Sequence, residues 1–580
     1  MTLIGTKRNG KPLILTPGDR ALHTHVIGAP GTGKSSLFVH AICEDILDGH
    51  GVCLIDPHGP LARGVLEWCA AHDMQKYRRI HIIDPDDPEW CAAFNPLRRD
   101  GHTQPTARVD AMVEACAQVW GGADMSTTPL LKKCLKAVFY ALLMRDLTLA
   151  EAFELVSSTG GLRRDLTEGL PDYIYEALWR EFNALSRREF AEQFSSTANR
   201  LTEFLGSPLV RRIIGQRDNA LDFRRIMDEG DIVICNFSDK GNLSEDNARV
   251  IGTLITRELF LLAKTRDAEV AEQRPFYLYI DECYKFLTQD VVRMLDETRK
   301  FGLHVILAHQ RLAQLRAHGE EIYNGVMGGA ANKIVFRLED DTDAQIVALQ
   351  VMRDHINLER PKHILDKPIV VDEVPIWLDS ESQSLGESEG KSATESSGWS
   401  SLAGASDGTG EGFQVLEGQP PEQTGASTSR SAFAADGSSG GFAATESQST
   451  FTGNTHGRSQ TLKPVRRILP TAVHSFEEEV HRLVNILRRL PHRVAMAQPA
   501  GCTAVRIRTP DVTAPLVWPE MVDAFCASAS SASPYVVSVQ SADAELHARR
   551  QRLLEHGRST EGDDAFWHET APSVPRGRVQ

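Results

Sequence analysis

Apolar residues in the first part of the chain form short runs with helical stretches between them, at Leu22–Ile27, Val52–Ile55 and Ile80–Ile83. Short buried strands that alternate with helices are typical of crossover units and a parallel sheet. The same signal returns later in the chain, at 231–238, 276–282, 304–310 and 333–339. We therefore predict one α/β core built from two parts of the chain, residues 1–99 and 226–378.

Between these two parts the periodicity changes from strand-like to helical. Three segments repeat apolar residues at spacings of three and four, namely AMVEACAQVW, LLKKCLKAVFYALLM and YEALWREFNAL. Such spacing places apolar side chains on one face of a helix. Residues 100–225 are therefore predicted to form an all-α domain inserted into the core.

Residues 379–460 have a different composition. Ser and Gly make up 32 of these 82 positions, and 11 acidic side chains outnumber 3 basic ones. A segment with so little apolar surface cannot offset the entropy lost on ordering. We predict a flexible acidic linker.

Regular patterning resumes in the C-terminal part of the chain. Ser475 and Glu478 fit a capping box, and the helix that follows would precede two strand-like runs at 493–498 and 504–509. This small α/β segment, residues 461–540, is predicted to return to the core. Small, polar and charged residues dominate 541–580, where we expect a flexible tail.

A complete GxxxxGK[ST] string joins the first apolar run to a predicted helix. Glycines let backbone N–H groups surround a phosphate, and the helix N-terminus favours negative charge. The lysine can reach the β- and γ-phosphates of ATP, and the following hydroxyl can ligate Mg²⁺. The alternative is a Gly/Pro-rich turn without a ligand, which the strand and helix on either side argue against. The predicted nucleotide-binding residues are Gly28, Ala29, Pro30, Gly31, Thr32, Gly33, Lys34, Ser35 and Ser36.

A pair of acids supplies the second half of an ATPase site. Asp281 and Glu282 follow the apolar run FYLYI. Asp281 would join Ser35 in holding Mg²⁺, and Glu282 would act as general base toward the attacking water. Two solvated acids at a strand end are the alternative, which loses weight beside an intact P-loop.

Three other features carry weaker signals. Gln310 ends a further strand and could sense the γ-phosphate, or it could be a surface amide. Arg299 precedes a glycine that resembles a helix C-cap, a place where a basic residue needs no function. Asp56 begins the turn DPHG, which could face the nucleotide or simply end a strand.

Charge and cysteine content narrow the function classes only partly. The net charge of −15 neither supports nor excludes a DNA partner, because the linker alone contributes −8. The ten cysteines are scattered and the 20 histidines show no metal-ligand spacing, so we expect reduced thiols, a cytoplasmic protein and no metal but Mg²⁺. No stretch approaches the roughly 20 apolar residues of a membrane span.

Several strings taken together resemble the type IV secretion coupling proteins, which are TraG/TraD-type conjugative DNA-transfer ATPases related to the HerA/FtsK motors. The resemblance covers roughly residues 20–378, through GAPGTGKSS, LIDPHG, FNPL, LDFRRIMDEGDIVICNFS, YLYIDE and DETRKFGLHVILAHQRLAQL. RRLPHRVAMAQ and VRIRTPDV resemble the family's closing strands.

The resemblance implies a RecA-like P-loop core, hexameric assembly and DNA passing through a central pore. It implies catalytic roles for Glu282, for Gln310 as a sensor and for Arg299 as a finger reaching a neighbouring subunit's ATP. It also implies a relaxase as partner. Coupling proteins usually begin with transmembrane helices, whereas this chain reaches its P-loop by residue 28. We therefore expect that it recruits a separate membrane partner, moves DNA in the cytoplasm, or serves outside secretion.

Two other functions stay open at this point. The chain could be a nucleotide-dependent switch or adaptor that recruits partners through its all-α domain and tail. It could also be a motor that remodels protein. The complete catalytic set favours hydrolysis, and DNA stimulation of ATPase activity would separate a DNA motor from both alternatives.

Overall fold

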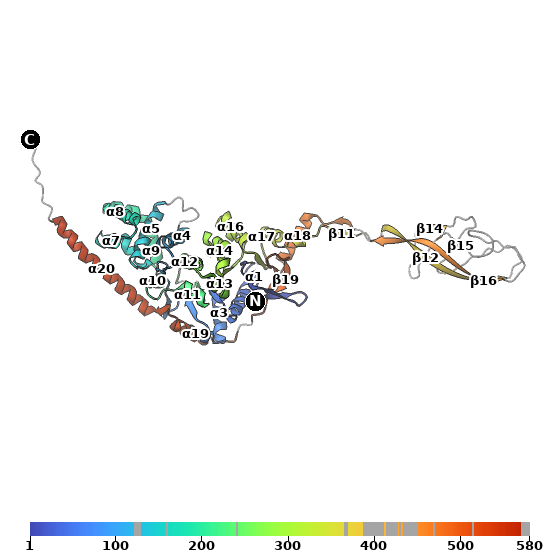
Figure 1. Ribbon diagram of the computed structural model, residues 1–580, viewed down its shortest axis with the longest axis horizontal. Helices are drawn as coiled ribbons and strands as arrows, with labels where there is room; N and C mark the ends of the chain where they lie inside the picture. The colour runs from blue at the N-terminus through green and yellow to red at the C-terminus, as the bar shows by residue number, and fades with distance from the viewer. Residues whose placement is uncertain are drawn as a thin grey trace, which may run out of the picture. The chain divides into compact units, whose positions relative to one another are not determined.

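The computed structural model describes residues 1–120, 129–157, 160–238, 242–364, 369–386, 411–412, 427–428, 431–432, 451–467, 470–512 and 515–569. The chain divides into two compact units (Figure 1). The first unit contains residues 1–356 and 480–580, and the second contains 357–479. The candidate site lies in the first unit.

An 11-stranded sheet forms the centre of the first unit, with strand order β2-β1-β19-β18-β10-β3-β9-β8-β4-β7-β5. The seven strands from β10 to β5 are parallel, and the pairs from β10 through β18, β19 and β1 to β2 are antiparallel. The parallel strands are β3 (Thr24–Ile27), β4 (Gly51–Asp56), β5 (Ile80–Ile83), β7 (Ile232–Asn236), β8 (Phe276–Ile280), β9 (Leu303–His309) and β10 (Asn332–Val335). The antiparallel strands are β1 (Thr2–Lys7), β2 (Pro12–Leu15), β18 (Val494–Gln498) and β19 (Val505–Arg508).

Helices cover both faces of the parallel strands, which explains why these strands are buried on both faces. Along β4, Val52 and Leu54 enter one hydrophobic core while Cys53 and Ile55 enter the other. Helices α2 (Lys34–Leu47) and α3 (Pro60–Ala71) contribute to the first core, and α12 (Glu245–Ala263) and α14 (Gln289–Glu297) to the second. The predicted fold class, an α/β core with a mainly parallel sheet, is confirmed.

The described residues between β6 (Trp90–Ala92) and β7 form a group of helices, where an all-α insertion was expected. Trp179, Phe182 and Phe194 pack together in their interior, and the Trp179 Nε1–H donates to the Ala137 carbonyl at 3.1 Å. The principal helices are α4 (Pro105–Trp120), α5 (Pro129–Met144), α8 (Tyr173–Ala184), α9 (Arg187–Leu205) and α10 (Pro208–Ile214).

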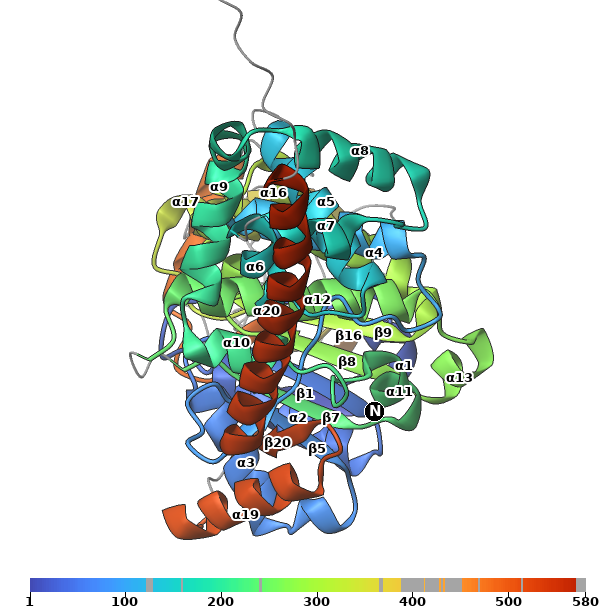
Figure 2. The same ribbon diagram turned by 90° about the vertical axis from the view of Figure 1, so that its left-hand side faces the viewer.

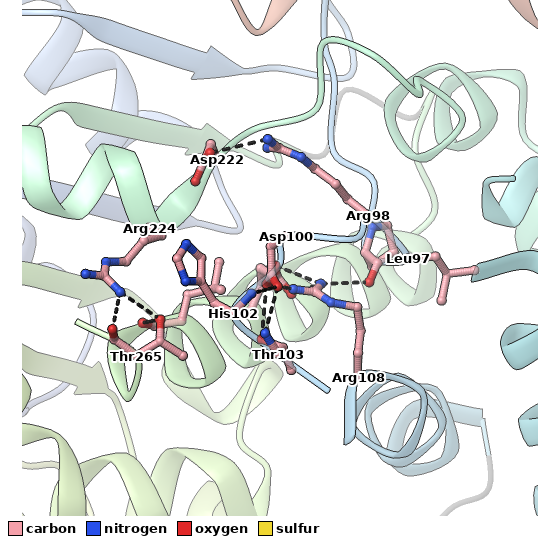
Figure 3. Close-up of polar contacts among 12 residues, drawn as sticks. Leu97, Arg98, Asp100, His102, Thr103, Arg108, Asp222, Arg224 and Thr265 are labelled. Atoms are coloured by element: carbon pink, nitrogen blue, oxygen red, sulfur yellow. Dashed lines mark hydrogen bonds and ion pairs between the residues drawn. The ribbon is translucent and has the colours of Figure 1, made fainter. Parts of the chain in front are cut away.

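A buried ion-pair network ties this helical group to the core where the chain enters it (Figure 3). Arg108 on α4 is 2% exposed and donates to both carboxylate oxygens of Glu258 on α12, at 2.9 and 2.8 Å. It also pairs with Asp100. Where the chain leaves the group, Asp222 pairs with Arg98 at 3.3 Å. Both crossings are thus held by arginine–carboxylate contacts.

The C-terminal part of the chain adds more to the first unit than the sequence indicates. Strands β18 and β19 enter the main sheet, α19 (Pro519–Ala532) packs against α3 and β5, and β20 (Val536–Ser538) pairs with β6. Helix α20 (Val539–Glu569) then runs along the helical group (Figure 2).

Where a flexible tail was expected over 541–580, residues 541–569 belong to helix α20, and the first part of this helix is packed. Ala542 and Arg549 are buried, and Leu546 and Leu553 are half-buried. These residues form one stripe at helical spacing, in which an ion-paired arginine occupies a position that usually holds an apolar side chain. Residues 570–580 lie outside the described part of the chain.

The second unit consists mainly of paired strands. Strand β12 (Ile369–Gly386) pairs antiparallel with β16 (Phe451–Arg467), and β11 (Pro361–Ile364) pairs with β17 (Pro470–Val473). The first residues of the expected linker, 379–386, belong to β12, and its last residues, 451–460, belong to β16. Their pairing uses backbone N–H and C=O groups, so it does not require apolar side chains. Most of the residues between these strands lie outside the described part of the chain.

Two further expectations concern local structure. Helix α18 (Phe476–Arg488) begins with the predicted capping box, since the Ser475 N–H donates to Glu478 at 3.0 Å and the Glu478 N–H donates to Ser475 Oγ at 3.2 Å. Among the helices that the structure describes, none is both long enough and apolar enough to span a bilayer.

Candidate functional site

The P-loop connects β3 to α2 and takes its shape from three glycines. Gly31 and Gly33 have φ of +67° and +111°, which L side chains rarely adopt. At Gly28, a Cβ would lie 2.5 Å from the Cβ of Phe336. Backbone N–H groups can therefore line the loop at the start of α2, as phosphate binding requires.

Lys34 is buried at the first position of α2. Its Nζ donates to the carbonyl oxygens of Gly28 at 2.6 Å and Ala29 at 3.1 Å. Burial lowers the pKa of Lys34, whereas the carboxylates of Glu282 and Asp281 act in the opposite direction. The ammonium group is therefore held inside the loop, between the place for a phosphate and the two acids.

Two acids follow β8 directly. Burial raises the pKa of Asp281 to about 7, and the nearby Glu282 and Asp56 add to this shift. Glu282 is 5% exposed and adopts a left-handed conformation with φ of +42°. Its Oε2 has no hydrogen-bond partner within the described part of the chain. Such crowding of buried carboxyl groups would be relieved by a cation or by a proton-donating ligand.

Gln310 lies at the end of β9 and contacts the second acid. Its Nε2–H donates to Glu282 Oε1 at 2.6 Å. Strand β9 lies between β3 and β8, and all three strands are parallel, so the P-loop, the acids and Gln310 follow at the same edge of the sheet. A small pocket at this edge is lined by Ala29, Pro30, Gln310, Arg311, Leu338, Glu339, Asp340 and Asp343.

Arg299 is not part of this constellation. It is exposed and lies in a short 3-10 helix, Thr298–Phe301, that precedes β9. The seven residues of β9 separate Arg299 from Gln310, which corresponds to about 23 Å of extended chain. Arg299 therefore lies at the opposite edge of the sheet from its own P-loop and cannot reach it within the same subunit.

Asp56 serves as a cap. One carboxylate oxygen accepts from the N–H of His58 at 2.9 Å and the other from the N–H of Ala62 at 2.8 Å, at the start of α3. Of the two interpretations left open for the DPHG turn, the structure supports a turn that ends a strand. Asp56 affects the site through its charge, by helping to raise the pKa of Asp281.

One residue beside the P-loop was missed in the sequence. The N–H of Arg493 donates to the carbonyl of Thr32 at 2.9 Å, and a Cβ on Gly33 would lie 3.2 Å from Arg493 Cγ. The Arg493 guanidinium is held by Asp511 at 2.5 Å and by the Thr509 carbonyl at 3.1 Å. The sole available signal was that RRLPHRVAMAQ resembles closing strands of the coupling proteins. That resemblance gave no reason to place Arg493 at the nucleotide.

The strand order defines the class of protein. A P-loop strand and a strand ending in two acids are separated by one strand that ends in a polar amide, which is the arrangement of a RecA-like P-loop ATPase core. Residues 275–360, which run from β8 beyond α17 (Asp341–Val351), match the family model described as the TraM recognition site of TraD and TraG. The predicted resemblance to the type IV secretion coupling ATPases is therefore confirmed.

Several solved structures are similar to the chain. The bacterial conjugative coupling protein TrwBdeltaN70 is 13% identical over 88% of this chain and 89% of its own, with a TM-score of 0.48. Plasmid coupling protein TrwB in complex with the ATP analogue ADPNP is 14% identical over 90% and 92%, with a TM-score of 0.48. VirB4 of Thermoanaerobacter pseudethanolicus is 13% identical over 60% and 87%, with a TM-score of 0.39. No curated protein matches the sequence.

Proposed function

We propose that the chain is an ATP-hydrolysing ring motor that translocates DNA. The observation that carries this proposal is the meeting of Lys34, Asp281, Glu282 and Gln310 at one edge of the sheet, while Arg299 lies at the other edge. Besides the lysine and Mg²⁺, a site of this kind uses an arginine as a further cation, which stabilises the charge that develops on the γ-phosphoryl group in the transition state. A neighbouring subunit can supply that cation.

Mg²⁺ fits the residues that are present. Asp281 lies buried with two other acids and its pKa is raised to about 7, so a divalent cation would favour the ionised carboxylate. Ser35 and Asp281 would hold the ion, which would neutralise charge on the bound phosphates. Lys34 would turn from the carbonyls of Gly28 and Ala29 toward the phosphate that enters the loop.

Glu282 is proposed as the general base. Its Oε2 is free to accept a proton from a water molecule, whereas its Oε1 is held by the Gln310 amide at 2.6 Å. The amide thereby orients the carboxylate, and it can also contact the terminal phosphate when nucleotide is bound. Lys34→Ala should abolish nucleotide binding, whereas Glu282→Gln should bind nucleotide and fail to turn it over.

Arg299 is proposed to act in trans, in a hexameric ring. Because it cannot reach its own P-loop, hydrolysis should depend on protein concentration. Arg299→Ala should assemble and bind ATP but hydrolyse it on the order of 10³-fold more slowly. The adjacent exposed residue offers a matched control, and Lys300→Ala should leave the rate nearly unchanged.

Mixing subunits tests the trans arrangement directly. Arg299→Ala subunits combined with Lys34→Ala subunits should regain part of the activity, because some interfaces pair an intact Lys34 with an intact Arg299. An arginine acting within its own subunit would give no gain. If the ATPase rate of the mixture does not exceed that of either variant alone, although subunit exchange has been verified, the ring-motor proposal is wrong.

DNA is the proposed cargo, and a relaxase and a separate membrane component are the proposed partners. TraM recognition by TraD and TraG makes a DNA-processing complex a reasonable partner class. The proposed compartment is the cytoplasm, since all ten cysteines lie within the described residues and are free thiols. ATPase rates with and without DNA decide the matter. Stimulation supports a DNA motor, and equal rates favour the switch or protein-remodelling function.

A further inference from the structure

Two histidines pack against each other inside the sheet, next to the candidate nucleotide site. His25 lies on β3, which leads into the P-loop, and His309 ends β9, immediately before Gln310. Their rings are stacked with centroids 4.9 Å apart, and their two Nε2 atoms are 2.6 Å apart. Both side chains are buried. A hydrogen bond thus joins the P-loop strand to the strand that carries Gln310.

The surroundings decide which nitrogen carries the proton. His309 Nδ1 lies 3.0 Å from the carbonyl oxygen of Arg311, which can only accept, so this nitrogen must be protonated. Burial lowers the pKa of His309 to about 3, so its ring is neutral and its Nε2 holds a lone pair. His25 Nε2–H is therefore the donor. The His25 ring therefore donates a hydrogen bond to the His309 ring, which in turn donates one to the Arg311 carbonyl.

The charges that act on this pair keep it neutral. Burial also lowers the pKa of His25 well below its usual value, and the ammonium groups of Lys333 and Lys34 oppose protonation of the two rings. Lys333 lies beside His25 on β10, and its Nζ donates to the Met327 carbonyl at 2.6 Å. Both rings therefore stay neutral at physiological pH, and His25 stays the donor to His309.

The hydrogen bonds of His309 surround Gln310. The His309 carbonyl accepts from the N–H of Gly28 at 3.3 Å, and its ring holds the Arg311 carbonyl. The side-chain oxygen of Gln314 accepts from the N–H groups of Gln310 and Arg311, at 3.1 and 3.0 Å. The backbone on both sides of Gln310 is thereby fixed while its amide reaches Glu282.

We propose that His309 is a positioning residue that holds Gln310 against Glu282, and that His25, on the P-loop strand, holds the His309 ring in place through its hydrogen bond. This inference rests on the proposed ATPase function. The pair would keep the distance between the P-loop and Gln310 constant, so that a nucleotide seated in the loop meets the amide in the right place. His309 itself need not touch nucleotide.

Three substitutions separate the two hydrogen bonds of His309. His309→Phe removes both, His309→Asn keeps a donor for the Arg311 carbonyl, and His309→Gln keeps a polar group toward His25. His309→Phe should lower kcat by about tenfold, the effect expected when the misplaced Gln310 amide loses one hydrogen bond in the transition state. Nucleotide affinity should change by less than about twofold, because the P-loop contacts remain. His309→Asn should recover most of the rate.

His304 provides the matched control. It lies on the same strand, is buried, and its pKa is likewise lowered to about 3, but it is distant from Gln310 along β9. His304→Phe should alter the melting temperature without a comparable loss of kcat. If His309→Phe and His304→Phe lower the melting temperature alike and His309→Phe keeps the wild-type kcat, the pair is merely structural and the proposal is wrong.

Ring-nitrogen NMR on nucleotide-free protein labelled with ¹⁵N-histidine gives a readout that does not require activity. The His309 signals, assigned by their loss in His309→Asn, should show a protonated Nδ1 and an unprotonated Nε2. The opposite tautomer, or a protonated ring, would overturn the proposal. A wild-type protein with this tautomer but without hydrolysis would instead overturn the ATPase function, so the two failures are distinguishable.

Discussion

Replacing Arg549 by alanine should release helix α20 from the helical group. Arg549 is 6% exposed, and its Nε–H donates to Glu151 at 2.7 Å. Its other nitrogens donate to Glu545, Thr148 and the Gly215 carbonyl. Glu151 is itself buried, and its second carboxylate oxygen caps a turn by accepting from Thr148. Truncation of Arg549 would leave the carboxylate of Glu151 buried without its partner.

Removing one member of a buried ion pair costs about 3–5 kcal/mol, because the remaining charge loses its compensation. The loss should appear as local opening of α20, since a protein of this size does not unfold in two states. Hydrogen exchange of the α20 backbone amides measures this opening. We expect exchange to accelerate about 100-fold or more, at roughly tenfold for each 1.4 kcal/mol.

The next residue on the same helix is a natural control. Arg550 also pairs with a glutamate at 2.7 Å, Glu154, but its side chain is 64% exposed. Glu154 is 12% exposed, but water reaches the Arg550 guanidinium and can replace it at the carboxylate, so the pair should contribute closer to the roughly 0.2–1 kcal/mol of surface pairs, and Arg550→Ala should accelerate exchange by less than about fivefold. Equal effects of Arg549→Ala and Arg550→Ala would refute the argument that burial makes the Arg549 pair decisive.

Three further predictions concern the core. Burial raises the pKa of Asp281 to about 7 in the folded protein, so between about pH 4 and 7 the folded state holds a proton that the unfolded chain has released. The melting temperature of nucleotide-free protein should therefore fall as pH rises through this window, and Asp281→Asn should make that fall smaller. Gly252→Ala should lower the melting temperature, because the new Cβ would lie 2.4 Å from the Phe286 ring, whereas Gly328→Ala, with no atom within 4 Å, should raise it; two increases would contradict the packing argument. Arg493→Ala should leave nucleotide affinity nearly unchanged in a titration, because the N–H that donates to Thr32 belongs to the backbone and survives the substitution, and a clear loss of affinity would show that the side chain itself supports the P-loop.

Local patterns were sufficient to predict the centre of the fold and the position of most site residues. Continuous apolar runs such as Phe276–Ile280 indicate strands buried on both faces, and the P-loop string specifies its own turn through Gly31 and Gly33. The hydrogen bond between Gln310 and Glu282 follows from strand order, which the sequence indicated only through the family resemblance. The roles of these residues in hydrolysis stay predictions.

Long-range contacts limited the rest. Helix α20 lacks an apolar stripe that stands out, because Arg549 replaces an aliphatic residue and its burial depends on Glu151, which is far away in sequence. Arg493 meets the P-loop through its backbone, a contact that no side-chain pattern encodes. The His25–His309 pair needs β3 beside β9 before it can be recognised.

The interleaving of chain ends in the main sheet bears on biosynthesis. In the sheet, β1 pairs with β2 and with β19, and β18 covers the outer edge of β10. A nascent chain emerging from the ribosome would therefore leave the β1 edge and the β10 edge without their partners β19 and β18 until residues near 508 had been made. Such late closure of a sheet is slow and leaves an edge that can recruit other chains. The main sheet can thus close only after residues near 508 have been made, and until then β10 is an edge at which another chain could pair.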